Sequence, residues 1–267
     1  MKKLFALLCI AIAIAACSGP AKKETAPTPE TRQPLAYGTL EIKDTIPLDE
    51  RSEDSPTLNI DISLEVPQDT TEVARHINAA IATTAFGYAN MQPQKAAEEM
   101  INALKSEYMD LRDIYLNEKA AGSYMGWLNN YCQIIGKVEE GKDGTICYSV
   151  FTEQFSGGAH PYSSVSYTNL YKDSGYEVTL DDIFKDGYEG TLTDMLVARL
   201  AEMNNVSTIE ELNEIGYLTI ADMFITSNFR LKQDSIIFHY NKYDIAPYAL
   251  GESCIGFKYD ELKEILK

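Results

Sequence analysis

The chain has 267 residues and a mass of 29.8 kDa, and 45% of the residues are hydrophobic and 24% charged. This composition is typical of a globular protein and is sufficient for one large domain or two small ones. The 40 acidic and 23 basic residues give a net charge of −17, which excludes nucleic acid as a partner and favours a basic one.

The first 17 residues have the pattern of a bacterial lipoprotein signal. Two lysines precede an apolar run from Leu4 to Ala16, which is shorter than the roughly 20 residues that a membrane-spanning helix needs. The motif Ile14-Ala15-Ala16-Cys17 then matches a lipobox, whose cysteine receives diacylglycerol. We therefore predict a signal peptide over residues 1–16 and lipidation of Cys17. The alternative is an ordinary secretory signal with an accidental cysteine.

Residues 17–36 are predicted to be a flexible linker, because residues 18–34 hold four of the ten prolines and no aromatic residue. Signal cleavage removes two lysines and no acid, so the mature charge is −19. We expect a domain attached to a membrane through its lipid in the bacterial cell envelope, at the outer membrane or on the periplasmic face. The leaflet and the orientation stay open.

The rest of the chain contains strands and helices grouped in runs, which predicts an α+β fold with a mostly antiparallel sheet packed with helices. We divide it into an N-terminal half (37–126) and a C-terminal half (127–267). The predicted strands are Gly38–Pro47, Thr57–Val66, Tyr131–Val138, Thr145–Phe155, Ser163–Tyr171, Tyr176–Thr179, Asn228–Lys232, Ser235–Tyr240 and Ile255–Tyr259. The predicted helices are Thr71–Phe86, Pro93–Asn117, Leu192–Met203, Thr208–Glu214 and Asp260–Leu266.

Three cysteines remain in the body: Cys132, Cys147 and Cys254. The turn Gly141–Gly144 predicts a hairpin whose register places Cys147 opposite Val138–Glu140. Cys132 is then on the order of 20 Å away along the strand, beyond disulfide reach. We expect buried free cysteines, while pairing of Cys254 with either of the others stays open.

Two stretches combine turn-forming residues with aromatic ones: Phe155–Pro161 (FSGGAHP) and Phe238–Gly251 (FHYNKYDIAPYALG). Glycine permits positive φ and proline fixes φ, so both stretches are predicted to form loops. The structural positions are Gly157, Gly158, Pro161, Pro247 and Gly251. The candidate binding residues are His160, Tyr162, Tyr243 and Tyr248.

Each candidate has a structural alternative. His160 is either a contact residue that titrates near neutral pH or part of a turn in which it bonds a backbone carbonyl. The tyrosines either form an aromatic surface facing a sugar or a protein, or they are sheet residues with buried rings. Loss of stability without loss of binding in His160→Ala would favour the structural alternative.

The two motifs, in this order and spacing, are similar to the extracytoplasmic domain of RsiV-type anti-sigma factors, which also precedes the catalytic domain of PdaC-type peptidoglycan deacetylases. The resemblance covers roughly residues 37–267. It implies a non-catalytic α+β module, and it raises lysozyme, a strongly basic enzyme, as a partner to test. Neither a sigma-factor-binding domain nor a deacetylase domain is expected in this chain.

No motif for catalysis stands out. The three histidines have no metal-ligand spacing, and no nucleophile elbow, phosphate loop or dinucleotide fingerprint is present. Asp181 and Asp182 are either a carboxylate pair or, as we favour, acids that cap a helix start. We predict no catalytic residue, no metal and no cofactor.

The leading hypothesis is a lipid-anchored, non-catalytic envelope protein that binds a macromolecule such as a basic, lysozyme-like hydrolase. The alternatives are a peptidoglycan- or glycan-binding module and a cell-wall glycan hydrolase with two carboxylates in one cleft. The oligomeric state stays open.

Overall fold

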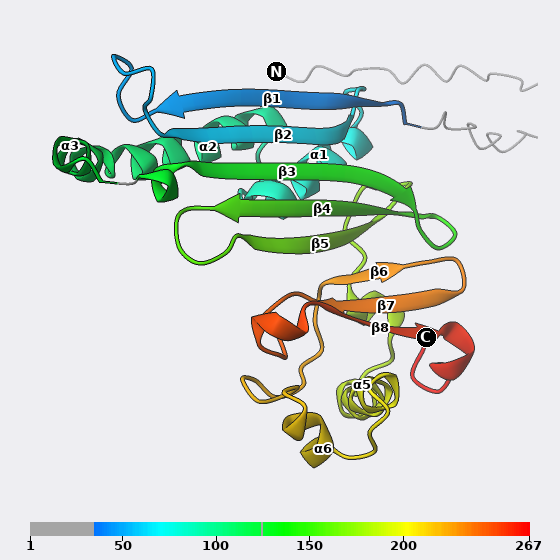
Figure 1. The fold of residues 1–267 in the computed structure, drawn as a ribbon. Helices are drawn as coiled ribbons and strands as arrows, with labels where there is room; N and C mark the ends of the chain where they lie inside the picture. The colour runs from blue at the N-terminus through cyan, green and yellow to red at the C-terminus, as the bar shows by residue number, and fades with distance from the viewer. Residues whose placement is uncertain (1–34, 124) are drawn as a thin grey trace, which may run out of the picture. The chain divides into compact units, whose positions relative to one another are not determined.

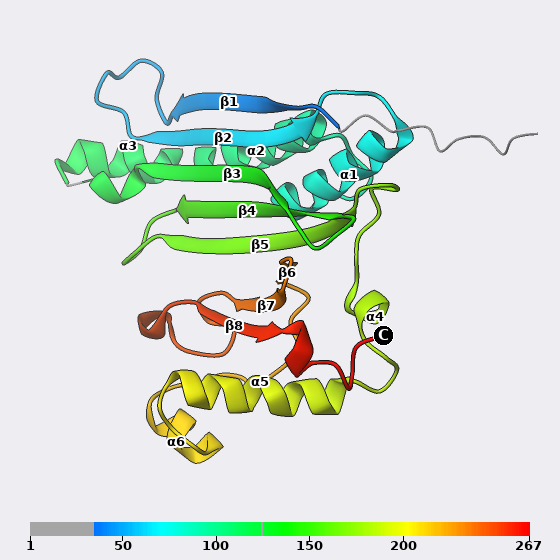
Figure 2. The same cartoon turned by 90° about the vertical axis from the view of Figure 1, so that its right-hand side faces the viewer.

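Two β-sheets follow one another along the chain (Figures 1 and 2). They are seen in a computed structural model that describes residues 35–123 and 125–267, which belong to one unit. The predicted signal peptide (1–16), Cys17 and all but the last two residues of the predicted linker (17–36) lie outside the described residues. Within the described part of the chain, no helix is long and apolar enough to cross a membrane.

The first sheet has the strand order β1-β2-β3-β4-β5. Its neighbouring strands pair antiparallel except β2 and β3, which run parallel and are joined by a crossover through three helices. This arrangement confirms the predicted α+β class with a mostly antiparallel sheet. The strands are β1 (Tyr37–Pro47), β2 (Thr57–Pro67), β3 (Asn130–Glu140), β4 (Thr145–Phe155) and β5 (Tyr162–Tyr171).

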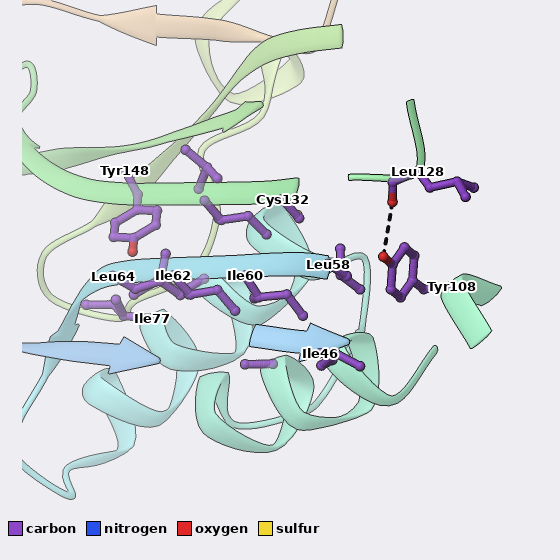
Figure 3. Close-up of a cluster of buried hydrophobic side chains, with 14 of the residues drawn as sticks. Ile46, Leu58, Ile60, Ile62, Leu64, Ile77, Tyr108, Leu128, Cys132 and Tyr148 are labelled. Atoms are coloured by element: carbon purple, nitrogen blue, oxygen red, sulfur yellow. Dashed lines mark hydrogen bonds between the residues drawn. The ribbon is translucent and has the colours of Figure 1, made fainter. Parts of the chain in front are cut away.

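One face of this sheet is buried under the crossover helices. Every second residue of β2 from Leu58 to Leu64 is buried, and the residues between them point to the other face. Figures 1 and 2 show the three helices on one side of the sheet. In the resulting core the Tyr108 hydroxyl donates to the Leu128 carbonyl at 3.0 Å (Figure 3). The helices are α1 (Glu72–Phe86), α2 (Pro93–Met109) and α3 (Arg112–Ala121).

The prediction of one helix over residues 93–117 is wrong, because α2 ends at Met109 and α3 begins at Arg112. The Leu111 N–H donates to the Tyr108 carbonyl at 3.1 Å, which closes a turn tighter than an α-helical one. Buried tyrosines lie on both helices, Tyr108 on α2 and Tyr115 on α3. The apolar stripe therefore continues across the break, and periodicity alone does not reveal it.

The second sheet is antiparallel, has the order β6-β7-β8, and shares a separate hydrophobic core with α5. The helix contributes Leu192, Leu196 and Leu200, which are all fully buried and recur every four residues. The elements of this region are α4 (Leu180–Ile183), α5 (Glu189–Met203), α6 (Ile209–Glu214), β6 (Phe229–Leu231), β7 (Ser235–Tyr240) and β8 (Ser253–Lys258). Short 3-10 turns are η1 (Gly126–Leu128), η2 (Tyr248–Leu250) and η3 (Tyr259–Glu261).

Two predicted elements of this region are wrong. Residues 176–179 form only an isolated bridge, between Glu177 and Leu170, rather than a strand. Residues 260–266 are not an α-helix; the 3-10 turn η3 is followed by a bridge between Leu266 and Phe184. The final residue, Lys267, donates its N–H to the Ile183 carbonyl at 3.0 Å. The backbone of the C-terminal segment is therefore used for pairing with the α4 region.

Asparagine side chains join the two sheets where β5 faces β6. Asn169 of β5 donates its Nδ2 to a β6 carbonyl at 2.8 Å and accepts a β6 N–H at 2.9 Å through Oδ1. Asn228 and Asn241 act in the opposite direction, since each accepts an N–H of β5 and donates to the Val165 carbonyl. These amides satisfy backbone groups that an unpaired edge strand would otherwise expose.

The predicted boundary between residues 126 and 127 lies within η1, and strands from both sides of it share the first sheet. All three body cysteines are free. The predicted hairpin register is confirmed, because Cys147 lies opposite Glu139. Cys132 and Cys147 are buried as expected, but Cys254 is exposed, since it lies on the edge strand β8 and alternates with the buried residues Ser253 and Ile255.

Candidate functional site

The two sequence motifs meet in space. The His160 ring stacks on the Tyr248 ring with centroids 3.8 Å apart and planes inclined by 19°. The Tyr248 hydroxyl also donates to the Pro161 carbonyl at 3.3 Å. Residues 88 positions apart in the sequence thus form one contact on the surface, between the loop that precedes β5 and the turn η2.

The loops that carry these residues depend on unusual backbone conformations. Gly157 and Gly158 have φ values of 90° and 107°, as the predicted turn requires. Tyr243 has φ of 72° although it is not a glycine. Left-handed backbone costs a residue with a Cβ about 1–2 kcal/mol. The strain at Tyr243 therefore marks a position where the side chain is kept at an energetic cost.

Tyr243 extends the stack, since its ring centroid lies 5.7 Å from that of Tyr248. Lys242 Nζ lies 5.0 Å from the Tyr248 ring centroid and donates to Ser163 Oγ at 2.7 Å, so it holds a cation over the ring. His160 is exposed and Tyr243 is 50% exposed. Three of the four candidate residues are therefore brought together, with His160 and Tyr243 exposed and Tyr248 half-buried between them.

Tyr162, the fourth candidate, is the first residue of β5 and is 46% exposed. Among the described residues no ring contact joins it to the other three. His160 also has the contact expected of the structural alternative, because its Nδ1 lies 3.1 Å from the Pro161 carbonyl oxygen. Geometry thus gives His160 both a turn contact and an exposed stacking position.

Two further aromatic residues lie beside this group on the uncovered face of the first sheet. Tyr131 and Phe155 are directly opposite each other in the β3–β4 register, with ring centroids 6.2 Å apart. Tyr131 donates its hydroxyl to Glu153 Oε1 at 2.5 Å. This hydrogen bond, followed by burial and the charges of Glu153 and Tyr248, raises the pKa of Tyr131. Phe155 is the last residue of β4 and directly precedes the loop that carries His160, so the Tyr131–Phe155 pair adjoins that loop.

Tyr162 lies opposite Gln154, which lies opposite Cys132, so its side chain belongs to the other face of the sheet. We call the remaining five residues the aromatic surface: Tyr131, Phe155, His160, Tyr243 and Tyr248. Sequence reasoning missed Tyr131 and Phe155. Strand alternation places both on the face opposite the buried Cys132 and Ile134. Knowing that this face is free of helices requires the tertiary packing.

The aromatic surface has side chains suited to non-covalent binding. Its rings, the Lys242 ammonium and the Glu153 carboxylate offer stacking, cation–π and hydrogen-bonding partners. In the part of the chain that the structure describes, no group of three or more His, Cys, Asp or Glu side chains is arranged to hold a metal ion. Two cavities of about 450 Å³ each lie elsewhere, one between the β3–β4 and β6–β7 turns and one beside α1 and β5. A smaller cavity of about 180 Å³ has Tyr131 and Phe155 in its lining.

Asp182 caps the start of a helix, which confirms the capping interpretation for this member of the Asp181-Asp182 pair. The Asp182 carboxylate accepts both the Thr179 N–H and the Thr179 hydroxyl at 2.8 Å, which forms a capping box at the start of α4. These hydrogen bonds lower the pKa of Asp182. Its carboxylate is therefore committed to the helix start.

Comparisons with known proteins identify a domain in this chain. Residues 181–260, which include the second motif, match the family model described as a protein of unknown function, DUF3298. A crystal structure of a DUF3298 family member from Bacteroides fragilis is similar, with 28% identity and a TM-score of 0.78 over 87% of this chain and 94% of that one. The chain therefore carries a DUF3298 domain.

Two more distant likenesses agree with this result. Peptidoglycan-N-acetylmuramic acid deacetylase PdaC of Bacillus subtilis is 27% identical over 186 residues, which cover 68% of this chain. The match spans only 39% of that relative's length. A DUF3298 protein from Pseudomonas aeruginosa is 18% identical with a TM-score of 0.59, over 88% of this chain and 95% of that one, and shares the fold. The resemblance to RsiV-type anti-sigma factors stays a prediction.

Proposed function

We propose that this chain is a non-catalytic binding module of the bacterial cell envelope, and that it recognises a macromolecule through the aromatic surface. The observation that carries the proposal is the stack of the exposed His160 on the half-buried Tyr248, which joins the two motifs at the surface. Exposed aromatic side chains held in fixed geometry supply large contact area at little entropic cost.

The envelope location is supported by two independent observations. The sequence predicts a lipoprotein signal with Cys17 as the attachment point. The relative from Bacillus subtilis is, by its name, a peptidoglycan-modifying enzyme, and the match covers a region of it that corresponds to most of this chain. Anchoring through Cys17 would suspend the binding module from a membrane, since dual or triple acylation gives stable attachment.

The partner that we propose is a basic, lysozyme-like hydrolase. A net charge of −17 attracts a cationic protein over distances of about 10 Å at moderate salt. Such attraction accelerates association and orients the partners, while the desolvated aromatic rings provide the short-range affinity. Glu153, which faces the aromatic surface, adds a local acceptor for lysine or arginine.

The test is a titration of the soluble body with lysozyme at low and at moderate salt. We expect binding at micromolar concentration or below that weakens as salt rises. The matched variants are Tyr243→Gly and Tyr176→Ala, because Tyr243 is 50% exposed in the aromatic surface and Tyr176 is 60% exposed outside it. Loss of binding in Tyr243→Gly, with binding retained in Tyr176→Ala, supports the proposal. No binding by the wild-type body at either salt concentration removes lysozyme as the partner.

His160→Ala separates the two roles that the geometry gives to this residue. A contact role predicts weaker binding with a melting temperature within about 2 °C of wild type, since exposed substitutions cost little stability. A purely structural role predicts a lower melting temperature and unchanged affinity. Both quantities are measured on the same purified variant.

A second candidate, a glycan-binding module, is favoured by the same aromatic rings, because flat rings also stack on sugars. It gains support from the similarity to a peptidoglycan-modifying enzyme. Sedimentation with insoluble peptidoglycan, with Tyr248→Ala and Tyr176→Ala as matched variants, tests it. Binding to cell wall that is lost in Tyr248→Ala, together with no binding to lysozyme, would favour this candidate over the protein partner.

A further inference from the structure

A thiol and an imidazole face each other outside the aromatic surface. His239 and Cys254 are directly opposite in the β7–β8 register, and His239 Nδ1 lies 3.2 Å from Cys254 Sγ. The histidine is only 3% exposed, whereas the cysteine is exposed. The pair therefore combines a thiol on an exposed residue with a buried imidazole that can act as its base.

The hydrogen bonds of Asn241 fix which ring nitrogen of His239 carries the proton. Asn241 Oδ1 accepts the Val165 N–H at 2.7 Å, and its Nδ2 donates to the Val165 carbonyl at 3.1 Å, so the amide has one orientation. His239 Nε2 lies 3.2 Å from the same Oδ1. An oxygen can only accept, so Nε2 holds the hydrogen and Nδ1 is the free acceptor. The Cys254 S–H consequently donates to Nδ1.

Charged and titratable groups from several strands face the Cys254–His239 pair. Glu252 Oε2 lies 3.6 Å from His239 Nε2 and can stabilise a positive charge on the ring. On the β5 side the Tyr167 ring meets His239 edge-on at 5.5 Å. Arg230 of β6 lies over Tyr167 at 5.4 Å and pairs with Glu139 at 3.7 Å. The cation of Arg230 favours a thiolate at Cys254.

We propose that Cys254 is a thiol–disulfide exchange site in which His239 acts as the base and Asn241 orients it. The Cys254 sulfur attacks a disulfide R–S–S–R, its proton passes to His239 Nδ1, and the S–S bond of the reagent breaks. A mixed disulfide Cys254–S–S–R forms, and the leaving thiolate takes the proton as R–SH. One disulfide and one thiol are consumed and formed, so the exchange needs no other oxidant.

The other two cysteines show why the base matters. Burial raises the pKa of Cys147 to about 12, and it also raises the pKa of Cys132, so both resist ionisation and are shielded from reagents. Burial and Glu252 raise the pKa of Cys254 as well. The resting thiol is therefore protonated, and rapid exchange depends on transfer of its proton to the neighbouring imidazole.

The experiment measures the reaction of the purified full chain with the aromatic disulfide 5,5′-dithiobis(2-nitrobenzoate) between pH 6 and pH 9. In the wild-type chain we expect a kinetic phase whose adduct maps to Cys254 by mass spectrometry. This phase should be absent in Cys254→Ser. In His239→Gln, which keeps a polar side chain at the site, that phase should be about tenfold slower at pH 7. Equal rates in wild type and a folded His239→Gln would overturn the proposal.

A measurement on the wild type alone keeps the proposal testable if His239→Gln does not fold. An unassisted thiol loses reactivity about tenfold for each pH unit below its ordinary pKa of about 8.5. A neighbouring imidazole accepts the thiol proton within the protein, so the rate depends less on the hydroxide concentration of the solvent. We therefore expect the Cys254 phase to fall by much less than tenfold between pH 8 and pH 7. A full tenfold fall, matching a free small-molecule thiol, contradicts a base at this site.

Discussion

The two faces of the first sheet have the same backbone but opposite roles. The face under α1, α2 and α3 is filled by aliphatic and aromatic side chains of the first core. The other face carries both polar and apolar side chains. Cys147 and Asn169 on it are buried, whereas Tyr131, Phe155 and Glu153 at one end are only half-buried. Covered positions are constrained by volume, whereas uncovered positions are free to carry residues for contact. Substitutions on the covered face should therefore change stability, and those on the aromatic surface should change binding.

The largest effect is expected from Gly136→Ala on the covered face. A Cβ at Gly136 would lie less than 3.0 Å from both the Tyr148 hydroxyl and Leu64 Cδ2, and both side chains are fully buried. Neither neighbour can move into solvent, so we expect a loss of about 3 kcal/mol in the free energy of unfolding. Chemical denaturation monitored by circular dichroism measures it.

Tyr148→Phe provides the partner of this substitution. The Tyr148 hydroxyl is buried without a hydrogen-bond partner. Its removal alone should therefore leave the free energy of unfolding unchanged or slightly increased. It also removes one of the two atoms that a Cβ at Gly136 would meet. The double variant should therefore recover part of the loss, and strictly additive effects would show that the overlap with the hydroxyl is not the cause.

A somewhat smaller effect is expected where the sheets join. Asn169→Ala removes a buried amide and leaves a carbonyl and an N–H of β6 without their partners. Each unsatisfied buried group costs about 1–3 kcal/mol, so we expect a total loss of about 2–3 kcal/mol after local relaxation. Asn59→Ala, whose hydrogen bonds are exposed, is the control and should cost less than 0.5 kcal/mol. Similar losses in the two variants would contradict the role of the junction.

Most of the fold could be predicted from the sequence because strand alternation and the Asp143-Gly144 turn are local signals. The hairpin β3–β4 has the predicted register for this reason. The break at Asp110 could not be predicted, since the local turn between Tyr108 and Leu111 leaves the apolar stripe uninterrupted. The unformed helix after Asp260 could not be predicted because the backbone of that segment pairs with the distant residues Ile183 and Lys185. The asparagine junction likewise has no local pattern, because an asparagine in a strand does not show which backbone it will face.

The candidate site also combines residues that local motifs predict with residues that only the tertiary structure identifies. His160, Tyr243 and Tyr248 were found from turn-forming motifs, and the structure brings these three rings together. Tyr131 and Phe155 belong to ordinary strands, and their place beside the stack follows from sheet order and from which face the helices leave uncovered. The Cys254–His239 pair required the β7–β8 register, which two separate strand predictions do not supply.

A smaller effect that depends on pH is expected from Asp182→Asn. Hydrogen bonds lower the pKa of Asp182 in the folded state, so its contribution is complete above the unfolded value of about 3.9 and is lost as pH falls through the folded value. The side chain is exposed, so at pH 6 we expect a loss below about 1 kcal/mol. The difference between variant and wild type should shrink at pH 3. A constant difference from pH 6 to pH 3 would mean that ionisation of Asp182 is not involved.

The smallest change in stability is expected from Tyr243→Gly, on the aromatic surface. Glycine removes the strain of a φ of 72°, which costs tyrosine about 1–2 kcal/mol. Against this gain stand the lost ring contact with Tyr248 and the greater freedom of glycine in the unfolded chain, about 0.5–1 kcal/mol each. These terms nearly cancel, so the free energy of unfolding should stay within about 0.5 kcal/mol of wild type. A clear loss of stability would make Tyr243 part of the framework, and the contrast between the two faces would then not extend to this loop.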